Sequence, residues 1–300
     1  MPASETIPCP ICNTEGVNPL YVTEGFTLGR CPDCRLVRQS PRPTADHIRE
    51  SNYDGVAQTR GNFFGRELKR DGLEFWQSQP LRAYEAGVAL VDAQRGGDAG
   101  TGLWLDVGAS TGSLLVAARN AGYDVTGVEL GSGQVAVCRE HHGFDVFHGT
   151  LHEAAYPDAH ADVVSYRHVL EHIHDVNGDL TEAHRILKPG GHLLIEVPNF
   201  GGLRYTSGRV RTALKLSKPV WRKLNLPEHL YYFTIDTLRQ LLTRNGFEVV
   251  AWATYGKTRI DRSAMRKAYD KVRDGLRVGN KLRVVARRVD RPQGEEASPA

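Results

Sequence analysis

The sequence predicts an α/β protein whose mostly parallel sheet is covered by helices on both faces, preceded by a small cysteine-rich module. From residue 103 onward, apolar runs of four to six residues alternate with helical segments, which is typical of parallel strands buried on both faces. Four of the five cysteines lie within the first 34 residues. The 300 residues are 40% hydrophobic and 24% charged, a composition that excludes a disordered or fibrous chain.

The expected elements follow in order from this alternation. Strands are predicted in "LWLDVG", "DVTGVEL", "FDVFHG", "ADVVSY" and "HLLIEVPN", and helices in "SLLVAARNAG" and "DLTEAHRILKPGG". The segment "TIDTLRQLLTRNG" is typical of a helix with Thr234 as N-cap and Gly246 just after its end. Two final strands, "FEVVAWATYG" and "KLRVVARRV", are expected on either side of a basic helical insertion.

We expect four segments in the chain. Residues 1–44 form the cysteine module, and residues 45–102 form a proline-containing linker followed by helices, whose apolar spacing is interrupted at Pro80. Residues 103–290 form the main domain, with a lid insertion at about 200–232. The polar end at 291–300 is expected to be disordered.

Charge and hydropathy narrow the function classes. The net charge of +3 does not indicate a strongly basic nucleic-acid-binding protein, although Lys and Arg gather at 204–223 and 257–291. These runs are either solvated helix faces or contacts for an anionic ligand. The sequence has no apolar run long enough to span a bilayer and no secretory signal at its beginning, so we expect a cytoplasmic protein without a transmembrane segment.

The four N-terminal cysteines have the spacing of a metal site. Cys9, Cys12, Cys31 and Cys34 form the pattern C-x₂-C-x₁₈-C-x₂-C, which fits a tetrahedral four-thiolate Zn²⁺ site. A single C-x-x-C would be compatible with a redox role, but two at this spacing favour a closed, structural zinc ribbon. The strands between them are too short to fold without the metal.

A glycine turn after the first main-domain strand indicates a ligand site. In "LDVGASTGSLL", Asp106 ends the strand, and Gly108 and Gly112 allow a ligand to approach the helix N-terminus. Glu129 ends the next strand, where a carboxylate can bind ribose hydroxyls. No Gly-Lys-Ser/Thr follows, which excludes a P-loop, and the dinucleotide spacing G-x-G-x-x-G is absent. The amino group and sulfonium of S-adenosylmethionine suit Asp106.

Residues 103 to about 255 resemble class I S-adenosylmethionine-dependent methyltransferases. The resemblance lies in "LDVGASTG", "VTGVEL", "ADVVSYRHVLEHIHD", "LKPGGHLLIEVPN" and "PEHLYYFTIDTLRQLLTRNGFEVV". It implies a Rossmann-like sheet of seven strands. Where relatives often have an acid for the adenine amino group this chain has Thr150, so that contact is expected near Leu151. The cofactor-binding residues implied by the match are Asp106, Gly108, Ala109, Ser110, Gly112, Glu129, Leu130, Leu151 and Arg167.

Histidines after the fourth strand are the candidates for chemistry. His168, Glu171 and His172 follow a strand end that faces the ligand crevice, and His229 lies in "PEHLYYF". A histidine suits removal of a hydroxyl proton near neutral pH, and the base candidates are His168 and His229. The segment "HVLEH" also resembles ubiquinone-type O-methyltransferases, some of which hold a divalent metal there. His168, Glu171 and His172 would then be ligands on one helical face, or they only shape the pocket.

These features favour a small-molecule methyltransferase, O-directed, with a saccharide or other biosynthetic intermediate as acceptor. The basic lid suggests a phosphorylated or carboxylated acceptor. An RNA methyltransferase that uses the zinc ribbon and lid is the alternative enzyme, and a zinc-ribbon scaffold is the non-catalytic alternative. Asp106 and Glu129 argue against a scaffold, which has no need of cofactor carboxylates.

Overall fold

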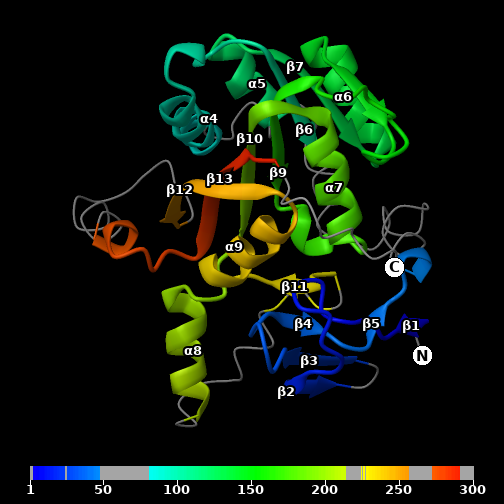
Figure 1. Cartoon of the computed structure of the whole chain (residues 1–300), viewed down its shortest axis with the longest axis vertical. Helices are drawn as coiled ribbons and strands as arrows, with labels where there is room; N and C mark the ends of the chain where they lie inside the picture. The colour runs from blue at the N-terminus through cyan, green and yellow to red at the C-terminus, as the bar shows by residue number, and fades with distance from the viewer. Residues whose placement is uncertain are drawn as a thin grey trace.

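Three sheets organise the described part of the chain: one of seven strands, one of four, and an antiparallel pair formed by residues 4–5 and 42–43 (Figure 1). The computed structural model describes residues 3–23, 26–47, 81–213, 224, 226, 228–256 and 272–290. Within these ranges, none of the helices combines the length and apolarity needed to cross a bilayer. The predicted helices between 63 and 80, most of the basic insertion after 256 and the predicted disordered tail lie outside the described residues. So does most of the predicted lid after residue 213.

The largest sheet has seven strands in the order β12-β13-β10-β9-β6-β7-β8. The five strands from β10 to β8 run parallel, and β13 is antiparallel to both β10 and β12. The predicted seven-stranded, mostly parallel sheet is confirmed. Strand order reverses between β6 and β9, which is where ligands bind in open sheets of this kind. The strands are β6 (Leu103–Val107), β7 (Asp124–Glu129), β8 (Asp145–His148), β9 (Ala161–Arg167), β10 (Leu187–Pro198), β12 (Phe247–Tyr255) and β13 (Lys281–Arg288).

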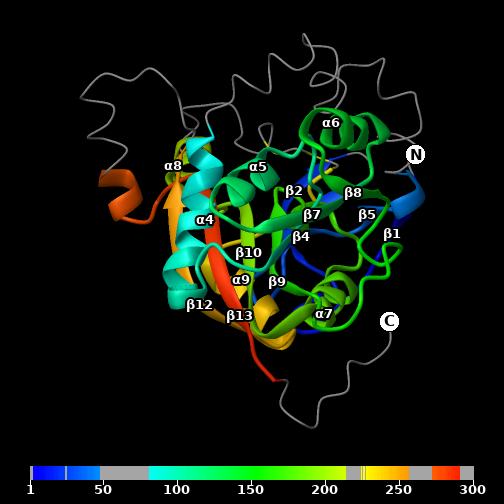
Figure 2. The same cartoon turned by 90° about the horizontal axis from the view of Figure 1, so that it is seen from above.

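Helices cover both faces of this sheet (Figure 2). Trp104 and Val163 of the sheet pack with helices α4 and α5 on one face. Leu105 and Val164 pack with α7 and α9 on the other. Because neighbouring side chains of a strand point to opposite faces, β6 and β9 both carry buried apolar residues on each face. The helices are α4 (Arg82–Arg95), α5 (Ser113–Asn120), α6 (Ser132–His142), α7 (Val176–Ile186), α8 (Leu203–Ala213) and α9 (Ile235–Arg244).

Three helix ends test the local predictions. The Thr234 side chain accepts a hydrogen bond from the Thr237 amide at 3.3 Å, and Gly246 has φ of 81°, so both predicted ends of α9 are confirmed. Helix α7 was expected to run into "LKPGG", but it ends at Ile186. Pro189 disfavours helical backbone at the preceding residue, and Leu187 already has extended backbone as the first residue of β10.

The four-stranded sheet has the order β11-β4-β3-β2 and combines distant parts of the chain (Figure 1). Cys31 and Leu36 belong to the same buried cluster as Leu230 and Phe233, so the cysteine module and the main domain share a core. Strand β11, which comes from the main domain, pairs antiparallel with β4. The strands of the module and β11 are β1 (Ser4–Glu5), β2 (Asn18–Thr23), β3 (Phe26–Arg30), β4 (Val37–Gln39), β5 (Arg42–Pro43) and β11 (Tyr231–Tyr232).

Candidate active site and metal centre

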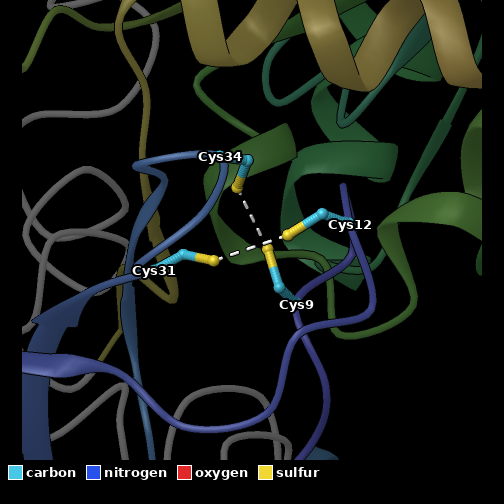
Figure 3. Close-up of side chains that lie close together, drawn as sticks. All are labelled: Cys9, Cys12, Cys31 and Cys34. Atoms are coloured by element: carbon cyan, nitrogen blue, oxygen red, sulfur yellow. Dashed lines mark hydrogen bonds between the residues drawn. The ribbon is translucent and has the colours of Figure 1, made fainter.

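The four predicted cysteine ligands converge on one point (Figure 3). The sulfurs of Cys9 and Cys34 are 3.4 Å apart, and those of Cys12 and Cys31 are 3.5 Å apart. All four sulfurs lie within 4.8 Å of one another, and none forms a disulfide. Thiolates bound at 2.3 Å to a tetrahedral Zn²⁺ stand about 3.8 Å apart, so this donor set fits zinc with little movement.

The glycine loop has a backbone that only small residues allow. Gly108 has φ of 72° and Gly112 has φ of 83°. A Cβ on Gly108 would stand 2.4 Å from the Val169 side chain, and a Cβ on Gly112 would stand 3.2 Å from the Cys138 sulfur. The loop therefore packs closely against the side chains of Val169 and Cys138. Helix α5 begins directly after the loop. The loop's amide groups and the helix N-terminus are placed at the carboxyl end of β6.

Two buried carboxylates flank this loop. Asp106 accepts a hydrogen bond from the Ser165 hydroxyl at 2.5 Å, and Glu129 accepts from the Ser110 and Gly131 amides at 2.8 Å each. Burial raises the pKa of Asp106 to about 7, although the Ser165 hydrogen bond lowers it, and burial also raises the pKa of Glu129. In the described part of the chain, neither acid forms an ion pair. A cationic ligand would supply the missing charge.

The remaining residues of the predicted cofactor set are placed as follows. Ala109 is buried in the loop, and the Leu130 side chain, directly after Glu129, is 37% exposed. A flat apolar ligand can pack on such an exposed side chain. Leu151 is buried in the main core, so only its backbone is suited to a ligand. The Thr150 amide and hydroxyl both donate to the Glu153 carboxylate, at 2.8 and 2.9 Å.

Arg167 lies in a buried ionic network that the sequence analysis missed. Its Nε donates to Glu196 at 2.9 Å, and its guanidinium stacks 4.0 Å from the Tyr84 ring centre. Arg283 pairs with the other Glu196 oxygen, and the Tyr255 hydroxyl donates to Glu196 at 2.6 Å. Burial raises the pKa of Glu196, but the two guanidinium charges outweigh it and lower the pKa to about 2. The contacts of Arg167 are thus to protein side chains.

Glu171, His172 and His229 come together at the mouth of the sheet. Their ligand atoms lie within 4.8 Å of one another, and the two imidazole rings meet edge to face at 4.6 Å. Glu171 is 1% exposed, and neither of its carboxylate oxygens has a hydrogen-bond partner among the described residues. Burial raises its pKa, but the surrounding imidazoles outweigh this effect and lower the pKa to about 2. Burial lowers the pKa of His229 to about 4.

His168 is held differently from the expectation. It has φ of 58° and precedes the short 3₁₀ helix η2 (Leu170–His172), so the predicted helical face shared with Glu171 and His172 does not form. Its Nε2 accepts from Lys281 Nζ at 2.8 Å, and its Nδ1 lies 3.6 Å from Glu171, which is too long for a hydrogen bond. Nothing in the sequence near His168 indicates its contact with Lys281 or its left-handed backbone.

Known proteins with similar sequences are methyltransferases. A family model described as "Methyltransferase domain" matches residues 66–251. The ubiquinone biosynthesis O-methyltransferase of Pseudomonas paraeruginosa is 33% identical over 160 residues, which are 51% of this chain and 64% of that protein. The protein of the same name from Pectobacterium atrosepticum is 34% identical over 101 residues, or 32% of this chain and 42% of the relative. The chain thus spans 42 to 64% of these relatives' lengths.

A solved structure shares the fold. The 1,6-didemethyltoxoflavin-N1-methyltransferase of Burkholderia thailandensis, crystallised with 1,6-didemethyltoxoflavin and S-adenosylhomocysteine, superposes with a TM-score of 0.52. The alignment covers 91% of this chain and 100% of the other at 18% identity. At that identity the likeness concerns the fold alone.

Proposed function

Because the chain belongs to the family of methyltransferase domains, we propose that it transfers a methyl group from S-adenosylmethionine to a hydroxyl of a small-molecule acceptor. The observation that carries this proposal is the pair of buried acids beside the glycine loop. Asp106 and Glu129 end adjacent parallel strands, are nearly inaccessible to solvent and form no ion pair among the described residues. A ligand with an amino group, a sulfonium and a ribose diol meets this requirement.

The cofactor side of the site follows from these positions. When bound, S-adenosylmethionine supplies an electrophilic methyl group. In our proposal Asp106 holds the amino group, Glu129 accepts hydrogen bonds from the ribose hydroxyls, and the exposed side chain of Leu130 packs on the adenine. Ser110 and Gly131 support this by fixing the carboxylate of Glu129 through their amides.

On the acceptor side we assign the base to His229 rather than His168. His229 is neutral at physiological pH because burial lowers its pKa to about 4, and it lies beside the Glu171 carboxylate. His168 Nε2 already accepts a hydrogen bond from Lys281. A neutral imidazole can accept the hydroxyl proton, and the Glu171 carboxylate beside it offsets part of the cost of charging the buried ring. The ubiquinone O-methyltransferase relatives support a hydroxyl acceptor, and a saccharide or phosphorylated intermediate remains part of the proposal.

Metal binding is proposed at two places. The sulfurs of the four cysteines fit a structural Zn²⁺. At the mouth, the one carboxylate and two imidazoles of Glu171, His172 and His229 suit a divalent cation, with His229 in the place expected for His168. With a divalent cation bound there, His229 would be a ligand of the metal, and the metal would bind the acceptor oxygen.

Calorimetry and a methyl-donor assay test the function. Titration of the zinc-loaded protein with S-adenosylmethionine should show one site, and Asp106→Asn should abolish it. Radiolabelled methyl donor should then label the small-molecule fraction of a cell extract, in preference to the RNA and lipid fractions. Absence of cofactor binding would contradict the proposed function. Labelling that is confined to RNA and lost in high salt would overturn the assigned acceptor class in favour of RNA.

A further inference from the structure

The cysteine module takes part in the mouth of the active site. Strand β4 pairs with β11, and the Gln39 amide donates to Leu230 O at 3.0 Å. The Gln39 side chain adds a second bond, from Nε2 to His229 O at 2.6 Å. The Leu230 amide in turn donates to Glu171 O at 2.8 Å. The backbones that carry His229 and Glu171 are therefore joined to each other and to Gln39.

Arg42 makes a parallel connection on the other side of the site. This side chain is 6% exposed, and its Nη1 donates to His174 O at 2.7 Å and to the Tyr231 hydroxyl at 2.9 Å. His174 Nε2 also lies 3.0 Å from Pro43 O. Gln39 and Arg42 of the module thus contact both the segment after β9 and the segment that contains β11. Together these two segments carry the side chains of Glu171, His172 and His229.

Strand β4, which ends at Gln39 and shortly precedes Arg42 of β5, begins next to the metal ligands. The Cys31 amide donates to Leu36 O at 2.8 Å, and Leu36 immediately precedes β4. The other pair of cysteines is anchored to the main domain, since Arg244 donates to Ile11 O at 3.0 Å. A metal ion shared by both cysteine pairs would therefore fix β4 relative to α9 and to the mouth.

From these contacts we propose that Gln39 and Arg42 are positioning residues for the cluster of Glu171, His172 and His229. In this role, zinc at the four cysteines holds both residues in register with β11. The zinc ribbon is then a structural wall of the acceptor site. The proposal rests on the proposed function only in taking this cluster as the place where the acceptor reacts.

The first experiment removes one donor and leaves the fold intact. Gln39→Met keeps the length of the side chain and the backbone bond to Leu230 but cannot donate to His229. Amide hydrogen exchange in residues 228–232 should accelerate about five- to tenfold, which is the expected effect of one lost hydrogen bond. The nuclear Overhauser effect between the ring protons of His172 and His229, which are close in the native protein, should weaken in histidine-labelled samples.

Matched variants separate positioning from general destabilisation. Gln134→Met changes another buried glutamine, on α6, and should leave both signals at the mouth unchanged. Arg42→Met should weaken the same ring signal, and Arg42→Lys, which keeps a donor, should restore part of it. Zinc content and S-adenosylmethionine binding should stay unchanged in Gln39→Met, so a failure of the proposed function is detected independently by calorimetry.

Zinc removal completes the test. A chelator should accelerate exchange in residues 170–174 and 228–232 while α5 stays protected. If Gln39→Met and Arg42→Met both leave the ring signal and the exchange of 228–232 at native values, the positioning role is wrong. If zinc-free protein keeps native protection in these segments, the coupling to zinc is wrong. Loss of protection throughout the zinc-free protein would also contradict a local coupling, because α5 would exchange as well.

Discussion

Replacing Asp106 with asparagine should stabilise the cofactor-free protein above neutral pH while it removes cofactor binding. The pKa of Asp106 is raised to about 7 from an ordinary value of 3.8 because the carboxyl is buried. Between these two values the folded protein holds a proton that the unfolded chain has lost. The free energy of unfolding therefore falls as pH rises through this window, and the loss is complete just above the folded pKa.

The magnitude follows from the size of the window. From pH 5 to pH 7 the contribution of Asp106 changes by two pH units, or about 3 kcal/mol at 1.36 kcal/mol per unit. Asparagine does not titrate and still offers an oxygen to Ser165. The difference in unfolding free energy, variant minus wild type, should thus be about 3 kcal/mol larger at pH 8.5 than at pH 5. Titrating groups that do not interact with Asp106 cancel in this difference.

Urea denaturation of the zinc-loaded, cofactor-free proteins at both pH values is the assay. Asp162→Asn is the control: hydrogen bonds from Lys188 and the Leu103 amide outweigh burial and lower the pKa of Asp162. Its carboxyl is ionised in both states across this range, so its stability difference should not change with pH. A stability difference for Asp106→Asn that is the same at both pH values would refute the assignment of a buried, uncompensated acid.

Further outcomes are expected for the cofactor, the base, the metal and the ionic network. Calorimetric affinity for S-adenosylmethionine should weaken toward tenfold per pH unit below pH 7, as Asp106 takes up its proton. His229→Ala should lower single-turnover methyl transfer about 100-fold or more, and His168→Ala less than tenfold. Elemental analysis should find one zinc per chain, lost in Cys31→Ser together with the exchange protection of β3 and β4. Glu196→Gln should cost about 3 kcal/mol in urea unfolding, because it leaves the buried guanidinium of Arg283 and the half-buried guanidinium of Arg167 without their carboxylate.

Local chemistry explains which parts of the fold could be predicted from the sequence. Strands β6 and β7 are short apolar runs bounded by glycine or acidic residues, and the ends of α9 are marked by Thr234 and Gly246. These signals act within a few residues and survive in any tertiary context. The predicted extent of α7 was wrong because β10 begins at Leu187, before Pro189. The apolar pattern alone marks no boundary between helix and strand at that point.

The parts of the site that were missed depend on long-range pairing. Strand β11 has two residues and no periodicity, and its partner β4 lies far away in sequence, so nothing local indicated that Gln39 contacts His229. The partners of Arg167 and His168 come from β10 and β13, and the left-handed backbone of His168 cannot be read from residue type. The sequence grouped His168 with Glu171 and His172 by spacing, and the tertiary fold brings His229 there instead.

The pairing of β4 with β11 also has a consequence during synthesis. Gln39 and His229 are 190 residues apart, so at 5 to 20 residues per second the module leaves the ribosome roughly 10 to 40 s before its partner strand exists. Through that interval the edge of β4 that pairs with β11 is open, although the four thiols have already been synthesised. An unpaired strand edge is an aggregation hazard. Early capture of zinc would keep the module compact until residue 231 arrives to close the sheet.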